Sequence, residues 1–562
     1  MYSKVYSASV YGIDAFLVEI ETHLDPAMPG MVIVGLPDSA VKESKERVTA
    51  AIKNSDFTFP QKKITVNLAP ADVRKEGSAF DLPIALGILT SLGIIPQENL
   101  DMTIALGELS LEGTLRPIHG ALSIAIECAK KGFKRIILPK ENAEEAALTG
   151  KLDVIPAESL KDVVDYLNDR YEIKPTSVDL DQIFDNIEEL ALLDLADVKG
   201  QENVKRALEV SAAGGHNILM IGPPGSGKTM LAKRIPGILP PLSLEEALET
   251  TKIHSVSGLL SKDEALIRIR PFRSPHHTIS NAALVGGGVG NVRPGEISLA
   301  HHGVLFLDEL PEFARNVLEV LRQPLEVKTI SISRTKMNVE YPANFMLVCS
   351  MNPTPDGESL DKTQSSPQQI KNYLGKISGP LLDRIDIHIE VPAVKYEELS
   401  SKRKGEPSSE IRKRVLAARQ IQIDRFKDLP KVYKNADMST KIIREYCVLD
   451  EVSQNLLKMA MSKFGLSARA YDRILKVART IADLEANDKI EPKHISEAIQ
   501  YRSLDREYWG WVKFLSYYLF NLIDIYFLKY VNYKLLTKTK YFFKLHWYNT
   551  YIINLKYESK WN

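Results

Sequence analysis

One stretch constrains the fold of this chain more than any other, because an apolar run leads directly into a glycine-rich loop and then a helical pattern. The apolar run is Ile218–Ile221, and the loop that follows it reads Gly222, Pro223, Pro224, Gly225, Ser226, Gly227, Lys228 and Thr229. This is the pattern G-x-x-x-x-G-K-[ST] in its required context, with a strand before it and a helix after it. The stretch therefore predicts a phosphate-binding loop within a mostly parallel α/β sheet.

The last two loop residues predict the bound species. Lys228 is expected to reach the β- and γ-phosphates, and Thr229 is expected to offer a hydroxyl ligand to Mg²⁺. A tight turn without a ligand is the alternative, and the agreement of the loop with both flanks disfavours it. ATP and Mg²⁺ are therefore the predicted cofactors.

A second apolar run, Gly303–Leu307, ends in two carboxylates, Asp308 and Glu309. Ligands of α/β sheets bind where the strands end, so both acids are expected beside the loop. Asp308 is predicted to hold Mg²⁺, and Glu309 is predicted to act as the general base on the attacking water. An apolar run before Asp-Glu is common at helix starts, so this prediction depends on its pairing with the phosphate loop.

A third apolar run, Phe345–Met351, is followed by Asn352, whose amide is expected between the other two strand ends. Arg384 and Arg469 each stand beside apolar segments. An arginine stabilises the charge that develops on the γ-phosphate, often from a neighbouring subunit. A surface salt bridge is the alternative for both arginines.

These features in this order, with helices after them, resemble the AAA+ ATPases, and residues 270–313 resemble their magnesium-chelatase-like branch. Residues 200–504 are similar to the ComM/YifB type, the competence-associated branch-migration helicases. The resemblance implies that Asn352 is the first sensor, Arg384 a trans-acting arginine finger and Arg469 the nucleotide sensor of the lid. A finger in trans needs a neighbour, so a homo-oligomeric ring is expected, with a hexamer as its form.

The first 165 residues alternate β-like runs with helical stretches, which predicts a separate α/β domain. It resembles the Lon-type protease fold (that of ribosomal protein S5 domain 2), but the nucleophile position reads Ala79, or Ser78 with a one-residue shift. Leu122 stands where the activating lysine is expected, and a serine needs an adjacent base to attack a peptide. Proteolysis is therefore not expected, and the domain is interpreted as a structural or DNA-guiding appendage.

Length and composition set the domain plan. With 562 residues, about three to four domains are expected. The predicted parts are a Lon-like domain (1–165), a linker (166–195), an AAA+ core (196–400), a helical lid (401–510) and an atypical tail (511–562).

The 72 basic residues equal the 72 acidic ones in number, so nucleic acid would have to bind at a local basic patch. Three cysteines without paired spacing disfavour disulfides and zinc knuckles. The N-terminus lacks a signal-peptide pattern, so a cytoplasmic protein is expected.

The predicted basic patch is Val327–Val339, whose alternation suits an exposed β-hairpin. Lys328, Arg334 and Lys336 on it could follow a DNA backbone through the pore of a ring. A solvated edge hairpin protected by its lysines is the alternative.

Two histidine pairs, His276-His277 and His301-His302, could suggest a metal. Neighbours on a strand face opposite sides, so each pair is expected to offer at most one ligand to a given site. A structural or subunit-contact role is therefore favoured over zinc.

The tail from residue 511 has nine Tyr, eight Lys and no Gly, Ala or Pro. Translation through a lost stop codon is the simplest hypothesis. Asn521 and Asp524 interrupt its apolar run, which disfavours a membrane span and leaves interfacial binding as an alternative.

The predicted function is a ring-forming AAA+ ATPase that couples ATP hydrolysis to translocation on forked, branched or single-stranded DNA. The alternatives are a magnesium-chelatase-type motor for metal insertion into a porphyrin, an ATP-dependent protease and a scaffold. The roughly 190 residues before the loop are taken as an argument against the chelatase motor.

Overall fold

The computed structural model describes residues 1–180, 193–261, 264–288, 292–334, 337–394, 396–397, 405–430, 432–504 and 508. By its internal contacts the chain divides after Arg502, and both large sheets belong to the unit before that residue. The tail from residue 511, Lys336 of the hairpin and part of the linker lie outside the described residues.

The N-terminal part forms a seven-stranded mixed sheet in the order β3-β4-β2-β1-β5-β8-β9. Its strands are β1 (Tyr2–Tyr11), β2 (Asp14–Asp25), β3 (Gly30–Val34), β4 (Lys63–Ala69), β5 (Thr103–Ala105), β8 (Arg135–Pro139) and β9 (Asp153–Ala157). The apolar runs at 16–18, 31–34 and 64–66 lie in β2, β3 and β4, as the sequence predicts. A short hairpin joins β6 (Glu108–Leu109) to β7 (Leu115–Arg116).

The helices of this part are α1 (Ser39–Asn54), α2 (Asp81–Ser91), α3 (Ala121–Lys130), α4 (Ala143–Ala147) and α5 (Leu160–Leu167). Every residue of α2 is buried, and the helix carries a single charge, Asp81. Arg47 of α1 donates to both oxygens of this carboxylate, over 2.6 and 3.0 Å. The pairing offsets the cost of burying the carboxylate, so α2 can lie inside the core.

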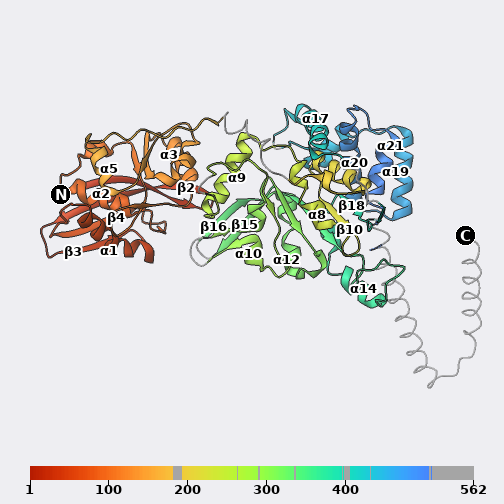
Figure 1. Cartoon of the computed structure of the whole chain (residues 1–562), viewed down its shortest axis with the longest axis horizontal. Coiled ribbons are helices and arrows are strands. Elements are labelled where there is room, and N and C mark those ends of the chain that lie inside the picture. The colour runs from red at the N-terminus through yellow and green to blue at the C-terminus, as the bar shows by residue number, and fades with distance from the viewer. Residues whose placement is uncertain are drawn as a thin grey trace, which may run out of the picture. The chain divides into compact units, whose positions relative to one another are not determined.

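The second sheet has five strands, all parallel, in the order β11-β14-β17-β10-β18 (Figure 1). They are β10 (Ile218–Ile221), β11 (Phe272–Arg273), β14 (Val304–Leu307), β17 (Met346–Met351) and β18 (Ile387–Glu390). Every residue of β10, β14 and β17 is buried, which is typical of parallel strands covered on both faces. The parallel arrangement gives the sheet a carboxyl edge, where its strands end, and an amino edge, where they begin.

Short elements surround this sheet. The helices are α7 (Glu202–Gly214), α8 (Lys228–Ala232), α9 (Leu244–Val256), α10 (Asn281–Val285), α11 (Glu296–Leu299), α12 (Arg315–Val320), α13 (Pro324–Val327), α14 (Pro367–Leu374) and α15 (Gly379–Leu382). Two small antiparallel pairs accompany them, β12 (Gly286–Gly287) with β13 (Arg293–Pro294) and β15 (Thr329–Arg334) with β16 (Met337–Pro342).

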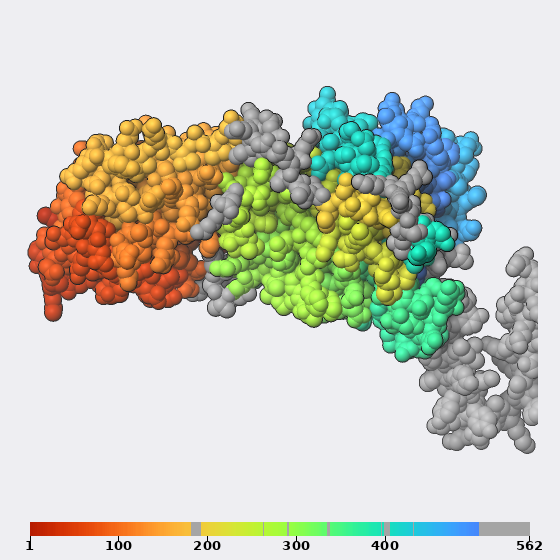
Figure 2. Space-filling view, in the orientation of Figure 1, coloured from red at the N-terminus to blue at the C-terminus, as the bar shows by residue number. Residues whose placement is uncertain are grey.

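The C-terminal described part is helical: α17 (Ser408–Phe426), α18 (Thr440–Tyr446), α19 (Glu451–Phe464), α20 (Ala468–Leu484) and α21 (Pro492–Gln500). Helices α17 and α20 pack on α7, which leads into β10, and Figure 2 shows this cyan and blue part lying against the yellow segment. Pro492 occupies the first turn of α21, where its fixed φ and missing N–H are compatible with the helix.

The α/β class, the parallel sheet and the helical C-terminal region are therefore confirmed. Within the described residues, no helix combines the length and the apolar character that crossing a membrane requires.

Candidate nucleotide site

The glycine-rich loop joins β10 to α8 at the carboxyl edge, and its geometry explains its composition. Gly225 and Gly227 have φ angles of +77° and +89°, in the left-handed region that favours glycine. At Gly222 a Cβ atom would lie 2.1 Å from the carbonyl oxygen of Val391. The backbone can therefore make this turn only with glycine at these positions.

Lys228 is the first residue of α8 and folds back over the loop. Its Nζ donates to the carbonyl oxygens of Gly222 and Pro223, over 2.7 and 2.9 Å, and to Asn352 Oδ1, over 3.2 Å. Burial lowers the pKa of Lys228, and the charges of Asp308 and Glu309 act in the opposite direction. The ammonium group thus connects the loop to the end of β17.

Asp308 follows β14 and accepts hydrogen bonds at both oxygens. Thr229 Oγ1 donates to Oδ2 over 2.7 Å, and Ser350 Oγ donates to Oδ1. The orientation of the carboxylate is therefore fixed from two neighbouring strand ends. Ser350 was not predicted from the sequence, because it lies inside an apolar run and comes beside Asp308 only through the pairing of β14 with β17.

Glu309 adopts an unusual backbone conformation for a residue other than glycine, with φ of +54°. Strained conformations of this kind are concentrated at functional sites. The side chain is 56% exposed, and its Oε2 lies 3.7 Å from His277 Nδ1. His277 is a second residue of this region that the sequence did not indicate, because a structural or subunit-contact role was expected for its pair rather than a place beside Glu309.

These residues surround one cavity of about 410 Å³. The lining includes Lys228, Thr229, Asp308, Glu309 and Asn352 together with part of the loop. The structure thus brings the three predicted segments together at the carboxyl edge. A cavity that combines a cation, two carboxylates, a hydroxyl and an amide suits a polyanion accompanied by a hard cation.

The two predicted arginines lie elsewhere in the chain, and neither lines this cavity. Arg384 is 6% exposed and donates to Glu326 and, over 2.5 Å, to the carbonyl oxygen of Pro380. Burial lowers the pKa of Arg384, as do Arg322 and Arg469. Arg469 near the start of α20 is largely exposed, with its Nη1 3.7 Å from Asp383 Oδ2.

The predicted hairpin exists as β15 and β16, but it is not a free-standing arm. Ile330, Ile332, Val339 and Tyr341 are buried along one face, in keeping with the alternating pattern, so the predicted hairpin is exposed on its other face only. Lys328 Nζ lies 2.6 Å from Asp437 Oδ1 of the helical part. Arg334 ends β15, and Lys336 belongs to the undescribed tip.

The expectation that each histidine pair offers at most one ligand is wrong for His301 and His302. They lie in a turn after α11 rather than on a strand, and both Nε2 atoms are within 3.1 Å of Glu249 Oε2. The backbone N–H of Asn344 donates to His301 Nδ1 over 3.0 Å, so the proton of this ring is on Nε2. Histidines that bind metals donate through their other nitrogen, so the trio forms a hydrogen-bonded cluster unsuited to a metal.

The Lon-like segment lacks a serine–lysine pair among its described residues. Ser78 Oγ donates to Glu108, and Lys75 Nζ donates to the carbonyl oxygen of Pro70. Leu122 is fully buried in an apolar cluster. No lysine among the described residues is hydrogen-bonded to Ser78, and the group that accepts from its hydroxyl is the carboxylate of Glu108. The absence of proteolysis stays a prediction.

Three family models cover most of the described chain. Residues 194–399 match the model described as magnesium chelatase, subunit ChlI, and residues 20–142 match the one described as subunit ChlI of Mg-chelatase. Residues 405–502 match the C-terminal model of the same subunit.

Full-length relatives are more specific. The uncharacterized protein YifB of Salmonella typhimurium is 46% identical over 507 residues, which are 89% of this chain and 97% of that protein. The competence protein ComM of Haemophilus influenzae is 46% identical over 506 residues, with the same coverage. The chain belongs to the ComM/YifB family of magnesium-chelatase-like proteins.

Membership of the ComM/YifB family supports an AAA+-type ATPase, in agreement with the fold and with the phosphate loop. The magnesium-chelatase subunit ChlI of Porphyra purpurea is a more distant relative, 24% identical over 226 residues, which are 36% of this chain and 58% of that protein. Because residues 20–142 match a model with the chelatase name, the N-terminal segment is not by itself an argument against the chelatase alternative.

Proposed function

We propose that this ComM/YifB protein hydrolyses ATP with Mg²⁺ at the carboxyl edge of its parallel sheet and uses the energy to move along DNA. The observation that carries the first half is the convergence of Lys228, the Thr229–Asp308 pair and Glu309 around one cavity. Three segments distant in sequence each contribute the group that phosphoryl transfer to water needs.

The residues fit Mg²⁺ because Thr229 Oγ1 and Asp308 Oδ2 are hard oxygen atoms only 2.7 Å apart. Thr229 and Asp308 would hold the ion, which would supply positive charge against the negative charge that develops on the phosphates. Ser350 keeps the carboxylate of Asp308 oriented toward it. Lys228 exchanges its loop carbonyls for phosphate oxygens.

Glu309 takes the proton of the attacking water in this proposal. Its carboxylate is half-exposed and lines the cavity, and its Oε2 lies 3.7 Å from His277 Nδ1. Asn352, whose Oδ1 is already held by Lys228, orients the same water. The proton passes to the Glu309 carboxylate, the water oxygen bonds to the γ-phosphorus, and the bond from the γ-phosphorus to the bridging oxygen breaks, which releases ADP and phosphate.

The test separates binding from chemistry. Glu309→Gln is expected to lower ATP turnover by about 10² to 10⁴ while nucleotide affinity stays near that of the parent, because the amide cannot accept the proton. Lys228→Ala is expected to lose nucleotide affinity itself. Turnover and equilibrium binding of a fluorescent nucleotide measure the two effects.

Glu312→Gln is the matched control, since Glu312 is an exposed glutamate three residues away that pairs with Lys376. Its turnover is expected to remain that of the parent. Turnover of Glu309→Gln within a factor of two of the parent would refute the assignment of the base.

The proposal includes a ring in which Arg384 acts on the nucleotide of a neighbouring subunit and Arg469 acts as lid sensor. Arg384 does not line the nucleotide cavity of its own chain, which supports a role in trans. Arg384→Ala and Lys228→Ala subunits are each expected to be inactive, and mixing them is expected to restore part of the turnover. A mixture as inactive as its components would show that Arg384 does not act in trans, and sedimentation tests the hexamer.

Translocation on DNA rests on two supports: the 46% identity to a protein named for competence, and the basic residues of the β15–β16 hairpin. Lys328, Arg334 and Lys336 are proposed to follow the phosphate backbone. Their triple alanine variant is expected to bind forked DNA more weakly, with the salt slope reduced by about 0.9 per lost duplex contact or 0.7 per lost single-strand contact.

The control replaces three exposed lysines of the helical part, Lys441, Lys458 and Lys489, and is expected to bind like the parent. An unchanged affinity and salt slope in the hairpin variant would contradict the DNA assignment. Stimulation of turnover by DNA distinguishes the translocase from the chelatase alternative, for which a porphyrin and partner subunits are required.

A further inference from the structure

A second polar cavity lies at the amino edge of the same sheet. Gly303 and Met346, where β14 and β17 begin, form part of its wall, and Gly215 before β10 forms another part. Its volume is about 50 Å³, whereas a single water needs about 10–15 Å³. The space therefore accommodates one small polyatomic ion or a few waters. We call it the junction cavity, because core and helical part both line it.

Four of the charged groups in or beside this cavity are already paired. Arg270 Nη2 lies 2.7 Å from Glu246 Oε2, and the other donors of the guanidinium reach the carbonyl oxygens of Pro240, Pro241 and His302. Asp437 Oδ1 forms an ion pair with Lys328 Nζ, with the two atoms 2.6 Å apart. The two carboxylates, Glu246 and Asp437, face four cations in or beside the cavity (Arg270, Lys328, Arg419 and Lys434), so positive charge is in excess there.

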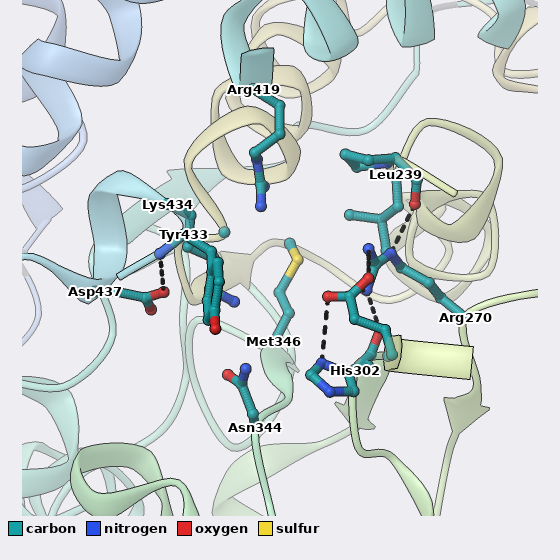
Figure 3. A pocket seen from close by; sticks show the side chains of 13 residues that line it. Leu239, Arg270, His302, Asn344, Met346, Arg419, Tyr433, Lys434 and Asp437 are labelled. Atoms are coloured by element: carbon teal, nitrogen blue, oxygen red, sulfur yellow. Dashed lines mark hydrogen bonds and ion pairs between the residues drawn. The ribbon is translucent and has the colours of Figure 1, made fainter. Parts of the chain in front are cut away.

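Arg419 and Lys434 are the remaining cations of the lining. Arg419 of α17 donates its Nε and Nη2 to the carbonyl oxygens of Ala213 and Ala212, over 3.1 and 2.9 Å, at the end of α7. Among the residues that the structure describes, neither Arg419 Nη1 nor Lys434 Nζ has a hydrogen-bond acceptor. Figure 3 shows the Arg419 guanidinium pointing into the cavity toward Met346, and Asn344 extending an amide from the opposite side.

We propose that the junction cavity binds a phosphate-class oxyanion, coordinated by Arg419, Lys434 and the Asn344 amide. Two cations that form no ion pair within 4.0 Å among the described residues, beside a neutral amide donor, form a set of hydrogen-bond donors that a tetrahedral oxyanion satisfies. The size of the cavity limits the ligand to a free ion or to a single terminal phosphate. The site is independent of the phosphate loop, which lies at the other edge of the sheet.

The bound ion would join the helical part to the core. Arg419 and Lys434 belong to the helical part, whereas Asn344 and Met346 belong to the core. Burial lowers the pKa of Lys434 to about 8, with Lys328, Arg419 and Arg270 acting in the same direction and Asp437 against it. An anion beside Lys434 favours its protonated form, so binding is coupled to the charge of this lysine.

The experiment titrates sulfate, whose charge does not change near neutral pH, into the full-length chain by calorimetry. Saturating Mg–ADP occupies the phosphate loop, and chloride keeps the ionic strength constant. Direct binding is measured because sulfate stabilises folded proteins generally. Lys434→Gln is compared with Lys458→Gln, a substitution of an exposed lysine on α19.

We expect saturable sulfate binding in the parent and in Lys458→Gln. The sulfate affinity of Lys434→Gln is expected to be lower by about tenfold or more. Equal affinity in the two variants, or no binding by the parent, would overturn the proposal. For the case that Lys434→Gln does not fold, the parent supplies a second readout. Its sulfate affinity is expected to fall between pH 7 and 9 as Lys434 loses its proton, and a flat profile would overturn the site.

Competition identifies the source of the phosphate. Displacement of sulfate by inorganic phosphate alone indicates the free ion, and displacement also by a 5′-phosphorylated oligonucleotide indicates a terminal phosphate. Hydrolysis is not a readout here, so failure of the proposed ATPase function would leave this result intact.

Discussion

The two edges of the five-stranded sheet use their charges differently. At the carboxyl edge, Lys228 lies among carbonyl oxygens, an amide oxygen and two acids that directly follow strands. At the amino edge, Lys434 and Arg419 come from the helical part, and neither forms an ion pair with a carboxylate among the described residues. The first edge keeps its cation partnered within the chain, whereas the second leaves two cations that an external anion can satisfy. A single parallel sheet thus presents two anion-binding environments of different construction.

The largest effect of a substitution that separates the two edges is expected at the carboxyl edge, on the Mg²⁺ dependence of turnover. Ser350→Ala removes the hydroxyl that orients Asp308, and partners of this kind typically contribute about 10- to 100-fold in metal affinity or activity. Turnover measured across a Mg²⁺ titration is expected to need more Mg²⁺ for half-saturation. The Ser350→Thr variant keeps the hydroxyl and serves as its control.

Sulfate binding at the amino edge is expected to be unchanged in Ser350→Ala. A loss at both edges would mean that the substitution disturbs β17 as a whole, and the two edges would then not be separable.

A smaller effect concerns stability at the amino edge. Burial lowers the pKa of His301 to about 4, so the folded chain keeps it neutral where the unfolded chain, with a pKa near 6.5, takes up a proton. The contribution of neutral His301 to the free energy of unfolding is therefore fully present above pH 6.5. It falls as pH decreases toward 4, by at most about 1.4 kcal/mol per pH unit.

Urea unfolding at pH 7.5 and 5 tests this dependence. His301→Asn keeps an acceptor for the Asn344 N–H but does not titrate, so it is expected to lose less stability at pH 5 than the parent does. The exposed residue His23 supplies the control His23→Asn, which is expected to behave like the parent. A parent and His301→Asn with equal pH dependence would contradict the assignment to His301.

The same contrast explains what the sequence could predict. The phosphate loop, the Asp308–Glu309 pair and Asn352 each follow an apolar run directly, so contiguous pattern was sufficient to place them at one edge. Ser350 comes beside Asp308 only through the register of β14 with β17, and His277 reaches Glu309 across a turn. No local pattern carries such information.

The amino edge was not predictable for the same reason. Arg419, Lys434 and Asn344 lie in three separate segments, and helix packing rather than a motif brings them together. The prediction for His301-His302 was wrong because it required a strand, in which neighbouring side chains face opposite sides. The pair lies instead in the turn after α11, where φ of +55° at His302 places both rings on one side.

The shortness of β14 has a mechanical consequence. Gly303 borders the junction cavity and Asp308 borders the nucleotide cavity, and only the four residues of β14 separate them. At about 3.3 Å per residue the two ends are roughly 16 Å apart. Because β14 is paired with β11 on one side and with β17 on the other, its two ends are held at a fixed separation. A displacement of Gly303 along the strand axis therefore moves the Asp308 carboxylate with it.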